Sequence, residues 1–398
     1  MLKILHTADW HLGQTFHDFE RQKEHLHFLS AIRRIIAERD IDALLVAGDV
    51  FDSPNPPAEA QEMYYRFLYE VTSENPDLQI IIIAGNHDSS ARLEAPAALL
   101  RLLNVHVRGV VKRTADGEID YQHLIIPIRQ GAAITAWCLA VPYLRYGDYP
   151  PAENLSKSVE KLFTDAYSHI PDKSLPVIAM AHLYAGGATI SQKDKSERII
   201  IGGEEGIRSE AFPEQLSYIA LGHLHRAQHL PHRENAYYSG APLPMSFAER
   251  TNKQSVIVVE LAENKANIEK IELSPLIPLQ SIFADSIKEL IERLHQLPEG
   301  DKHEAPYLEL IVRIAEPEPS LHNTVENILK TKRVQLARLT CFTQKDTTKY
   351  DTDEPVEADL HKLNPIDLAV DIFNRRGYDM SETMYSLLTK IIKDETNS

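Results

Sequence analysis

The sequence predicts an α/β fold: a layered domain over residues 1–274, a small α/β domain over residues 275–346 and a helical tail over residues 347–398. Two observations lead to this prediction. Short apolar runs of strand length alternate with segments whose apolar residues recur at helical spacing, a pattern typical of layered α/β domains. The pattern then changes near two prolines, Pro275 and Pro278, which marks the end of the first domain.

The strands of the first domain are expected where short, mainly apolar runs occur, at residues 3–7, 43–46, 80–83, 177–180, 218–220 and 255–260. Helices are expected between the first three strands, because apolar residues recur every three to four positions over residues 28–36 and again over residues 63–71. A further helix is expected to end near Leu103.

The small second domain is expected to be a βαβ-like unit without chemical motifs. Its predicted helices cover residues 287–294 and 325–329, and its predicted strands cover residues 308–314 and 334–339. An acidic, proline-containing linker follows, and then two short amphipathic helices begin near the N-cap candidates Asn364 and Asp379. These helices suggest a docking element for a partner; the alternative is that they pack back on their own chain.

The composition is that of a globular protein with an acidic balance. Hydrophobic residues make up 43% of the 398 residues, and 42 Lys and Arg against 58 Asp and Glu give a formal net charge of −16. This is the wrong sign for binding nucleic acid through bulk charge, so such a function needs local help from metal ions or from a basic partner.

The cysteine content and the lack of long apolar segments indicate the cellular compartment. The two cysteines, Cys138 and Cys341, make no disulfide framework or thiolate zinc site and fit a reducing cytosol. Asp9 and His11 interrupt the N-terminus too early for a signal peptide, and no window holds the roughly 18 uncharged apolar residues of a membrane span. We therefore expect a soluble, cytoplasmic protein with no membrane partner.

Five short motifs carry the chemical signal, and each follows a predicted strand. They are Asp9-Trp10-His11, Gly48-Asp49-Val50-Phe51-Asp52, Gly85-Asn86-His87-Asp88, Ala181-His182 and Gly222-His223-Leu224-His225. Ligands of open α/β sheets bind outside the carboxyl ends of strands, so separate motifs can converge there. The glycines allow sharp exits from the strands. Asp9 and His11, one residue apart, can face the same side of an extended segment.

The residue types indicate a divalent metal centre. Aspartate, asparagine and histidine side chains without thiolates suit Mn²⁺, Mg²⁺ or Fe²⁺ in open, water-bearing sites. Any single motif has an even or better chance of being an ordinary turn, but five in this order are a strong signal. Other histidines favour structural roles: His6 is expected in the core, and His17 and His25 on a helix or loop surface.

The order D-x-H, GD, GNHD, a single His and GHxH resembles the signature of the calcineurin-like metallophosphoesterases. The fuller text is similar to the SbcD family of bacterial nuclease subunits, in the stretches HTADWHLGQTFHDFERQKEH, ALLVAGDVFDSPNPPAEA, IIIAGNHDS, YIALGHLHRAQ and YYSGAPLPMSF. The resemblance covers the first domain. It implies a layered β-sandwich flanked by helices over residues 1–274, a capping domain after it, and partner-docking helices after the linker.

The resemblance also implies a two-metal site. One metal, Mn²⁺ or alternatively Mg²⁺, would be held by Asp9, His11, Asp49 and His225. The other would be held by Asp49, Asn86, His182 and His223, with Asp49 bridging the two. His87 would be the catalytic histidine, contacting the phosphate or protonating the leaving oxygen, and Asp88 would orient it.

The family resemblance implies a DNA nuclease, a 3′→5′ exonuclease on duplex ends and an endonuclease on single strands. It implies DNA, a coiled-coil ATPase of the SbcC type in a heterotetramer, and a second copy of this chain as partners. One alternative is a phosphatase or small phosphodiesterase, although Ser53 and Asp88 stand where phosphoprotein phosphatases usually carry Arg and Glu. Another is a non-catalytic scaffold, which would be expected to have lost ligands.

Overall fold

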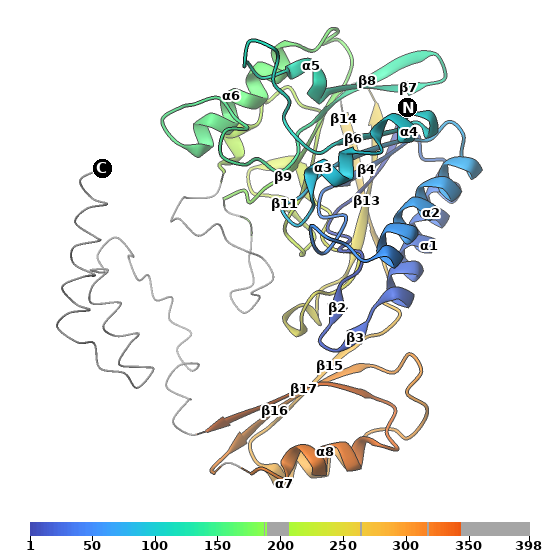
Figure 1. Cartoon of the computed structure of the whole chain (residues 1–398), viewed down its shortest axis with the longest axis vertical. Helices are drawn as coiled ribbons and strands as arrows, with labels where there is room; N and C mark the ends of the chain where they lie inside the picture. Colours follow the sequence, from blue (N-terminus) through green and yellow to red (C-terminus); the bar gives the residue numbers. More distant parts are fainter. Residues whose placement is uncertain (187, 189–206, 263–264, 317, 344–398) are drawn as a thin grey trace, which may run out of the picture. The chain divides into compact units, whose positions relative to one another are not determined.

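A computed structural model describes residues 1–186, 188, 207–262, 265–316 and 318–343 of the chain (Figure 1). The chain divides into two compact units, Met1–Thr343 and Gln344–Ser398. The predicted acidic linker and the two helices expected after it lie outside the described residues. Among the described residues we find no helical segment with the length and hydrophobicity of a membrane span.

The first sheet contains six strands in the order β14-β13-β1-β4-β5-β6. Strands β1, β4, β5 and β6 run parallel to one another, and β13 and β14 pair antiparallel at one side. The bounds are β1 (Leu2–Thr7), β4 (Ala43–Ala47), β5 (Gln79–Ile83), β6 (Val105–Arg108), β13 (Ser255–Ala262) and β14 (Lys265–Glu272). The four strands predicted here from apolar runs are confirmed.

The second sheet also contains six strands, in the order β11-β12-β10-β9-β8-β7. Strands β8, β9, β10 and β12 are parallel, and β7 and β11 close the two edges in the antiparallel sense. The bounds are β7 (Ile125–Gln130), β8 (Ala133–Ala140), β9 (Val177–His182), β10 (Tyr218–Gly222), β11 (Gln228–Leu230) and β12 (Arg233–Tyr238).

The two sheets pack face to face as a β-sandwich. Successive residues of a strand point to opposite faces, so alternate residues of each strand face the layer between the sheets. In β4 and β5, Leu45 and Ile81 point into the layer between the sheets, where they join Cys138 and Met180 of the second sheet. Their neighbours Leu44 and Ile80 belong to a separate core on the outer face of the first sheet. Both faces of these central strands are therefore buried, which explains their unbroken apolar runs.

Helices cover the outer faces (Figure 1). Helices α1 (Gln22–Arg39) and α2 (Ala58–Glu74) pack their predicted apolar faces on the first sheet. Helix α6 (Leu155–Ser168) contributes to the core outside the second sheet, and its N-cap Asn154 accepts a hydrogen bond from the backbone of Lys157. The helix predicted to end near Leu103 is a succession of short pieces, α3 (Ser90–Glu94), α4 (Ala97–Leu100) and a 3₁₀ turn to Leu103.

The small domain is a three-stranded parallel sheet with two helices, in the chain order β15-α7-β16-α8-β17. Four of its elements are as predicted from the sequence, and the first strand was missed. The bounds are β15 (Leu279–Ala284), α7 (Ile287–His295), β16 (Tyr307–Ile314), α8 (Leu321–Leu329) and β17 (Gln335–Thr343). Helices α7 and α8 bury their apolar faces against the sheet in a core of the domain's own.

A buried joint connects the small domain to the sandwich. The hairpin of β2 (Thr15–Phe16) and β3 (Phe19–Glu20) leads into Arg21, which is 1% exposed and forms an ion pair of 2.8 Å with Glu24. The hydroxyl of Tyr307, on β16, donates to Glu24 at 3.0 Å. The ring of Tyr307 stacks on Phe16, which also lies against Phe247.

Candidate metal centre

All five motifs emerge at the carboxyl ends of strands from both sheets. Asp9 follows β1, Asp49 follows β4, Asn86 follows β5, His182 ends β9 and His223 follows β10. Strands β1, β4 and β5 are neighbours in the first sheet, and β9 and β10 are neighbours in the second. The sandwich therefore brings side chains that are distant in sequence to one edge, as the strand-end positions predicted.

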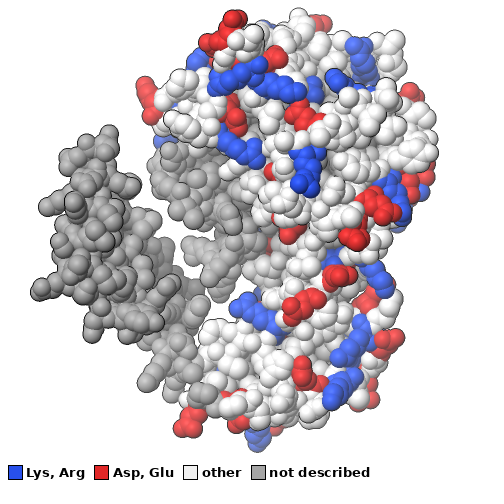
Figure 2. Space-filling model, viewed as in Figure 1, with Lys and Arg blue, Asp and Glu red and all other residues white. Residues whose placement is uncertain are grey.

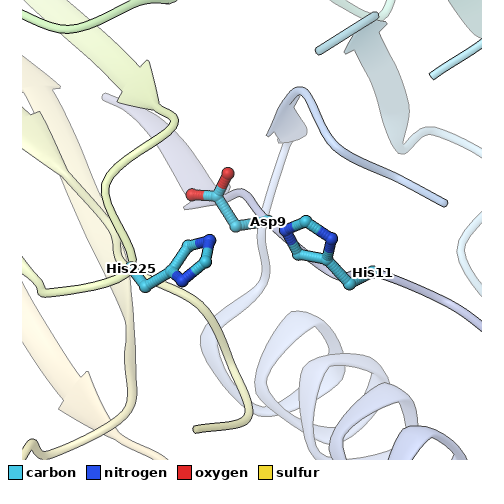
Figure 3. Close-up of side chains that lie close together, drawn as sticks. All are labelled: Asp9, His11 and His225. Atoms are coloured by element: carbon cyan, nitrogen blue, oxygen red, sulfur yellow. The ribbon is translucent and has the colours of Figure 1, made fainter. Parts of the chain in front are cut away.

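One group of donors consists of Asp9, His11 and His225, whose ligand atoms all lie within 4.8 Å of one another. Figure 3 shows the two imidazoles on either side of the Asp9 side chain. The ring centroids of His11 and His225 are 5.3 Å apart. Nε2 of His11 also lies 3.7 Å from the Asp49 carboxylate.

A second group surrounds Asn86. Its Oδ1 lies 3.0 Å from Nε2 of His182 and 3.0 Å from Nδ1 of His223. Nε2 of His182 lies 3.3 Å from Oδ2 of Asp49, the same oxygen that faces His11. Asp49 therefore stands between the two groups. The structure brings together all seven side chains predicted to be metal ligands.

The backbone at the site adopts a conformation that the sequence pattern did not predict. Asp9, His11, Asp49 and His223 have φ values of 54°, 45°, 48° and 102°, in the left-handed region that non-glycine residues seldom occupy. The expectation that Asp9 and His11 belong to an extended segment is therefore wrong. Hydrogen bonds from the Asp9 and His11 amides to the carbonyls of Gly48 and Asp49, both 3.0 Å, hold this loop in place. Such strain persists at functional sites where the surroundings fix it.

The glycines of the motifs serve close packing more than sharp turning. Gly48 has a φ of 93°, but Gly85 and Gly222 do not lie in the left-handed region. A Cβ on Gly85 would lie 2.1 Å from Oδ1 of Asp49, and a Cβ on Gly222 would lie 1.9 Å from the carbonyl oxygen of Ala47. These two positions exclude any side chain because the site and its supporting strands approach the backbone too closely.

His87 lies beside the donor groups, with its ring centroid 4.8 Å from that of His11. Its backbone N–H donates to Oδ1 of Asp49 at 2.8 Å, and its Nδ1 lies 2.8 Å from the carbonyl oxygen of Asp52. Because a carbonyl only accepts, Nδ1 carries the proton and Nε2 is the nitrogen available to a substrate.

Asp88 has other partners than the predicted one. Its buried carboxylate accepts hydrogen bonds from the backbone N–H groups of Gly85, Val50 and Phe51, at 2.9, 3.2 and 3.0 Å. Burial raises its pKa to about 6, against the lowering effect of these hydrogen bonds. Asp88 thus ties the loops after β4 and β5 together, while the carbonyl of Asp52 contacts the imidazole of His87.

Sequence reasoning missed Glu249, gave no role to Asp52 although it belongs to the second motif, and misplaced His25. Glu249, from the 3₁₀ turn η3 (Phe247–Glu249), lies 3.3 Å from Nδ1 of His225, and Asp52 lies 3.3 Å from Nδ1 of His11. His25 was predicted at the surface, but it is 1% exposed on the buried face of α1. His6 is buried as predicted, with Nδ1 2.8 Å from the hydroxyl of Tyr218.

The residues fit a divalent cation centre. Both ring nitrogens of His11 are buried and make no hydrogen bond among the described residues, although the carboxylates of Asp52 and Asp49 lie 3.3 and 3.7 Å away. The pKa of Asp49 is held low by His182, His11 and His87 although burial opposes this, so the carboxylate is ionised. Burial lowers the pKa of His182, yet Asp49 and Asp9 outweigh it and raise that pKa to about 9. Bound cations would take the place of this proton between the two carboxylates.

The sequence matches two known domain families. Residues 2–227 match the calcineurin-like phosphoesterases, and residues 275–376 match the type 5 capsule protein repressor C-terminal domain. The SbcD subunit of the SbcCD nuclease from Rhodobacter capsulatus is 36% identical over 92% of both chains. The SbcD subunit from Escherichia coli K12 is 32% identical over 71% of both chains, and that from Bacillus subtilis is 32% identical over 79% of this chain and 80% of the relative.

Proposed function

We propose that this chain, which belongs to the calcineurin-like phosphoesterases and among them to the SbcD nuclease subunits, is a two-metal DNA nuclease. The observation that carries the proposal is the position of Asp49, whose Oδ2 lies 3.7 Å from His11 and 3.3 Å from His182. Two donor groups on either side of one carboxylate are what a pair of closely spaced cations requires, because the shared negative charge offsets their repulsion.

The proposed ligands divide between the two groups. Asp9, His11, Asp49 and His225 would hold one ion, and Asp49, Asn86, His182 and His223 would hold the other. Oxygen and imidazole donors without thiolates favour Mn²⁺, with Mg²⁺ as the alternative. When bound, such a pair supplies an activated water and charge stabilisation for an in-line displacement at phosphorus.

Two side chains would contribute to catalysis without holding a metal ion. His87, fixed through Nδ1 by the carbonyl of Asp52, would present Nε2 to the phosphate or to the leaving oxygen. Asp88 would act indirectly, by holding the backbone that carries His87 against the loop after Asp49.

The substrate and the reaction follow from the SbcD membership. We propose a 3′→5′ exonuclease on duplex ends and an endonuclease on single strands, acting in DNA end processing. On the face of the molecule in Figure 2, Lys and Arg side chains are interspersed with Asp and Glu. Together with the net charge of −16, this indicates that DNA contact with the face in view would depend on metal ions or a basic partner.

Two protein partners are proposed. Residues 347–398 would dock an SbcC-type coiled-coil ATPase, and deleting residues 360–398 should abolish co-purification with that ATPase while sparing Mn²⁺ binding. A second copy of this chain would dock on the exposed apolar residues of α2, of α4 and of the 3₁₀ turn Arg101–Leu103, and two such chains would form a heterotetramer with two ATPase chains. Tyr69, Leu99 and Leu102 are 62%, 70% and 83% exposed there, while their elements bury neighbouring residues in one core.

The deciding experiment compares DNA with small phosphate esters. Linear plasmid DNA with free or blocked ends is incubated with Mn²⁺ beside p-nitrophenyl phosphate and bis-p-nitrophenyl phosphate, with Asp49→Asn as the inactive control. Preferential, metal-dependent loss of free-ended DNA supports the nuclease. Hydrolysis of the monoester alone would mean a phosphatase on the same scaffold, and no hydrolysis at all would mean a binding protein.

A further inference from the structure

Two histidines of the site have a carboxylate behind the ring: His11 has the partly exposed Asp52, 3.3 Å from its Nδ1, and His225 has the buried Glu249. The support of His225 therefore differs from that of His182 and His87. Its Nδ1 lies 3.3 Å from Oε1 of Glu249, and both side chains are buried. The corresponding nitrogens of His182 and His87 meet the neutral backbone carbonyls of Ala47 and Asp52, both at 2.8 Å. Among these three imidazoles, His225 is the one held by a full negative charge.

Glu249 is itself held firmly. Its second oxygen, Oε2, accepts the backbone N–H of Met245 at 3.0 Å, so the carboxylate is fixed between the start of its own turn and the imidazole. Because a carboxylate only accepts, Nδ1 of His225 must donate and Nε2 keeps its lone pair. Figure 3 shows one ring nitrogen of His225 turned toward Asp9 and the other turned away from it.

We propose that Glu249 is a positioning residue that fixes the ring and tautomer of His225 for one ion of the pair, and so sets the affinity of that ion alone. This inference rests on the proposed two-metal function. A carboxylate behind a ligating imidazole orients the ring and increases its donor strength, and loss of such a partner typically weakens metal binding about 10- to 100-fold.

The selectivity follows from the layout of the site. Glu249 contacts His225, which belongs with Asp9 and His11. The other proposed ion would be held by His182 and His223, whose neighbours are the Ala47 carbonyl and the Asn86 amide oxygen. A substitution of Glu249 therefore leaves the contacts of the second group intact. The affinity of the first ion should fall, and that of the second ion should stay the same.

The test is Mn²⁺ titration of the full-length, chelator-treated protein by calorimetry, with electron paramagnetic resonance to follow spin-coupled pairs. Glu249→Gln keeps the size of the side chain and an acceptor for Met245 but removes the charge. We expect one of two binding events to weaken about 10- to 100-fold, the other to stay unchanged, and the coupled signal to disappear at Mn²⁺ concentrations that saturate the parent.

Glu24→Gln is the matched control, because Glu24 is equally buried but pairs with Arg21 instead of a histidine. It should lower stability without lowering Mn²⁺ affinity. If Glu249→Gln does not fold, Glu249→Asp takes its place in the test. This variant moves the carboxylate away from His225 by one methylene and should weaken the same Mn²⁺-binding event. Unchanged binding in the folded variant, or equal weakening of both events, overturns the inference. A parent protein that binds no Mn²⁺ would instead overturn the two-metal function.

Discussion

Replacing Gly85 by alanine tests how closely the fold packs against Asp49. The added Cβ would lie 2.1 Å from Oδ1 and 2.3 Å from the backbone nitrogen of Asp49, where ordinary contact begins at 3.4 Å. Gly85 does not have a left-handed φ, so the effect of the substitution is steric and not conformational. The Asp49 side chain must therefore shift by about 1 Å, or the loop after β5 must retreat by as much, and displacements of this size at a reacting site cost about 10²-fold in rate.

Two quantities should change in the Gly85→Ala protein. Overpacking should lower the free energy of unfolding by about 1–3 kcal/mol, measured by denaturant titration. The Mn²⁺-dependent rate on linear DNA should fall about 100-fold at saturating DNA. Gly131→Ala is the control, since a Cβ there meets nothing within 4 Å although its φ of 61° adds strain. It should lose some stability and keep its rate. A Gly85→Ala protein with parental rate and parental Mn²⁺ affinity would refute the argument that Asp49 needs this space.

Three further predictions concern the catalytic histidine, the protonation of the site and the domain joint. His87→Ala should bind two Mn²⁺ ions in calorimetry yet cleave DNA about 10²- to 10⁴-fold more slowly, and retention of full activity would exclude His87 from catalysis. Because the pKa of His182 is raised from 6.5 to about 9, its proton stabilises the metal-free fold below pH 6.5, and this contribution disappears as pH rises through about 9. Since Mn²⁺ displaces that proton, its affinity should increase from pH 6.5 to 9, and a flat calorimetric profile would contradict the assignment. Glu24→Gln removes the counter-charge of the buried Arg21 guanidinium, which keeps its hydrogen bonds to Gln14 and to the Pro244 carbonyl. It should destabilise the chain by about 3–5 kcal/mol in denaturant titrations; a loss under about 1 kcal/mol would show that these neutral partners suffice.

The central strands could be predicted from the sequence because both of their faces are buried and their residues are therefore apolar throughout. Residues 80–83 are isoleucine throughout, and each of these side chains is fully buried in one of two cores. The strands β14 and β15 lie at sheet edges. No residue of β14 is buried and most of its residues are polar, while β15 buries only Ile282 and Ala284, so neither sequence has an unbroken apolar run. Helix α6 was missed although Asn154 and the spacing of Val159, Leu162 and Phe163 mark it.

The site was predictable to the extent that it consists of short motifs at strand ends. The seven proposed ligands and His87 were all found in this way, and the structure brings them together. Glu249 belongs to no motif and reaches His225 only through the tertiary fold, so no local pattern identifies it. The left-handed backbone of Asp9 and His11 also escaped prediction, because hydrogen bonds to the loop after β4 impose it from another part of the chain.

At the joint between the sandwich and the small domain, the buried charges all lie on the side of the sandwich, and this lowers the cost of separating the two parts. Both members of the buried ion pair, Arg21 and Glu24, belong to the sandwich, and the small domain adds the neutral phenol of Tyr307. If the small domain swung away, Arg21 and Glu24 would remain neutralised by each other. The losses around this ion pair would be the hydrogen bond from Tyr307 to Glu24 and the contacts of the Tyr307 ring with Phe16 and Phe19. A partner that separated the small domain from the sandwich would therefore have to overcome mainly apolar contacts. It would not leave a buried charge without its counter-ion.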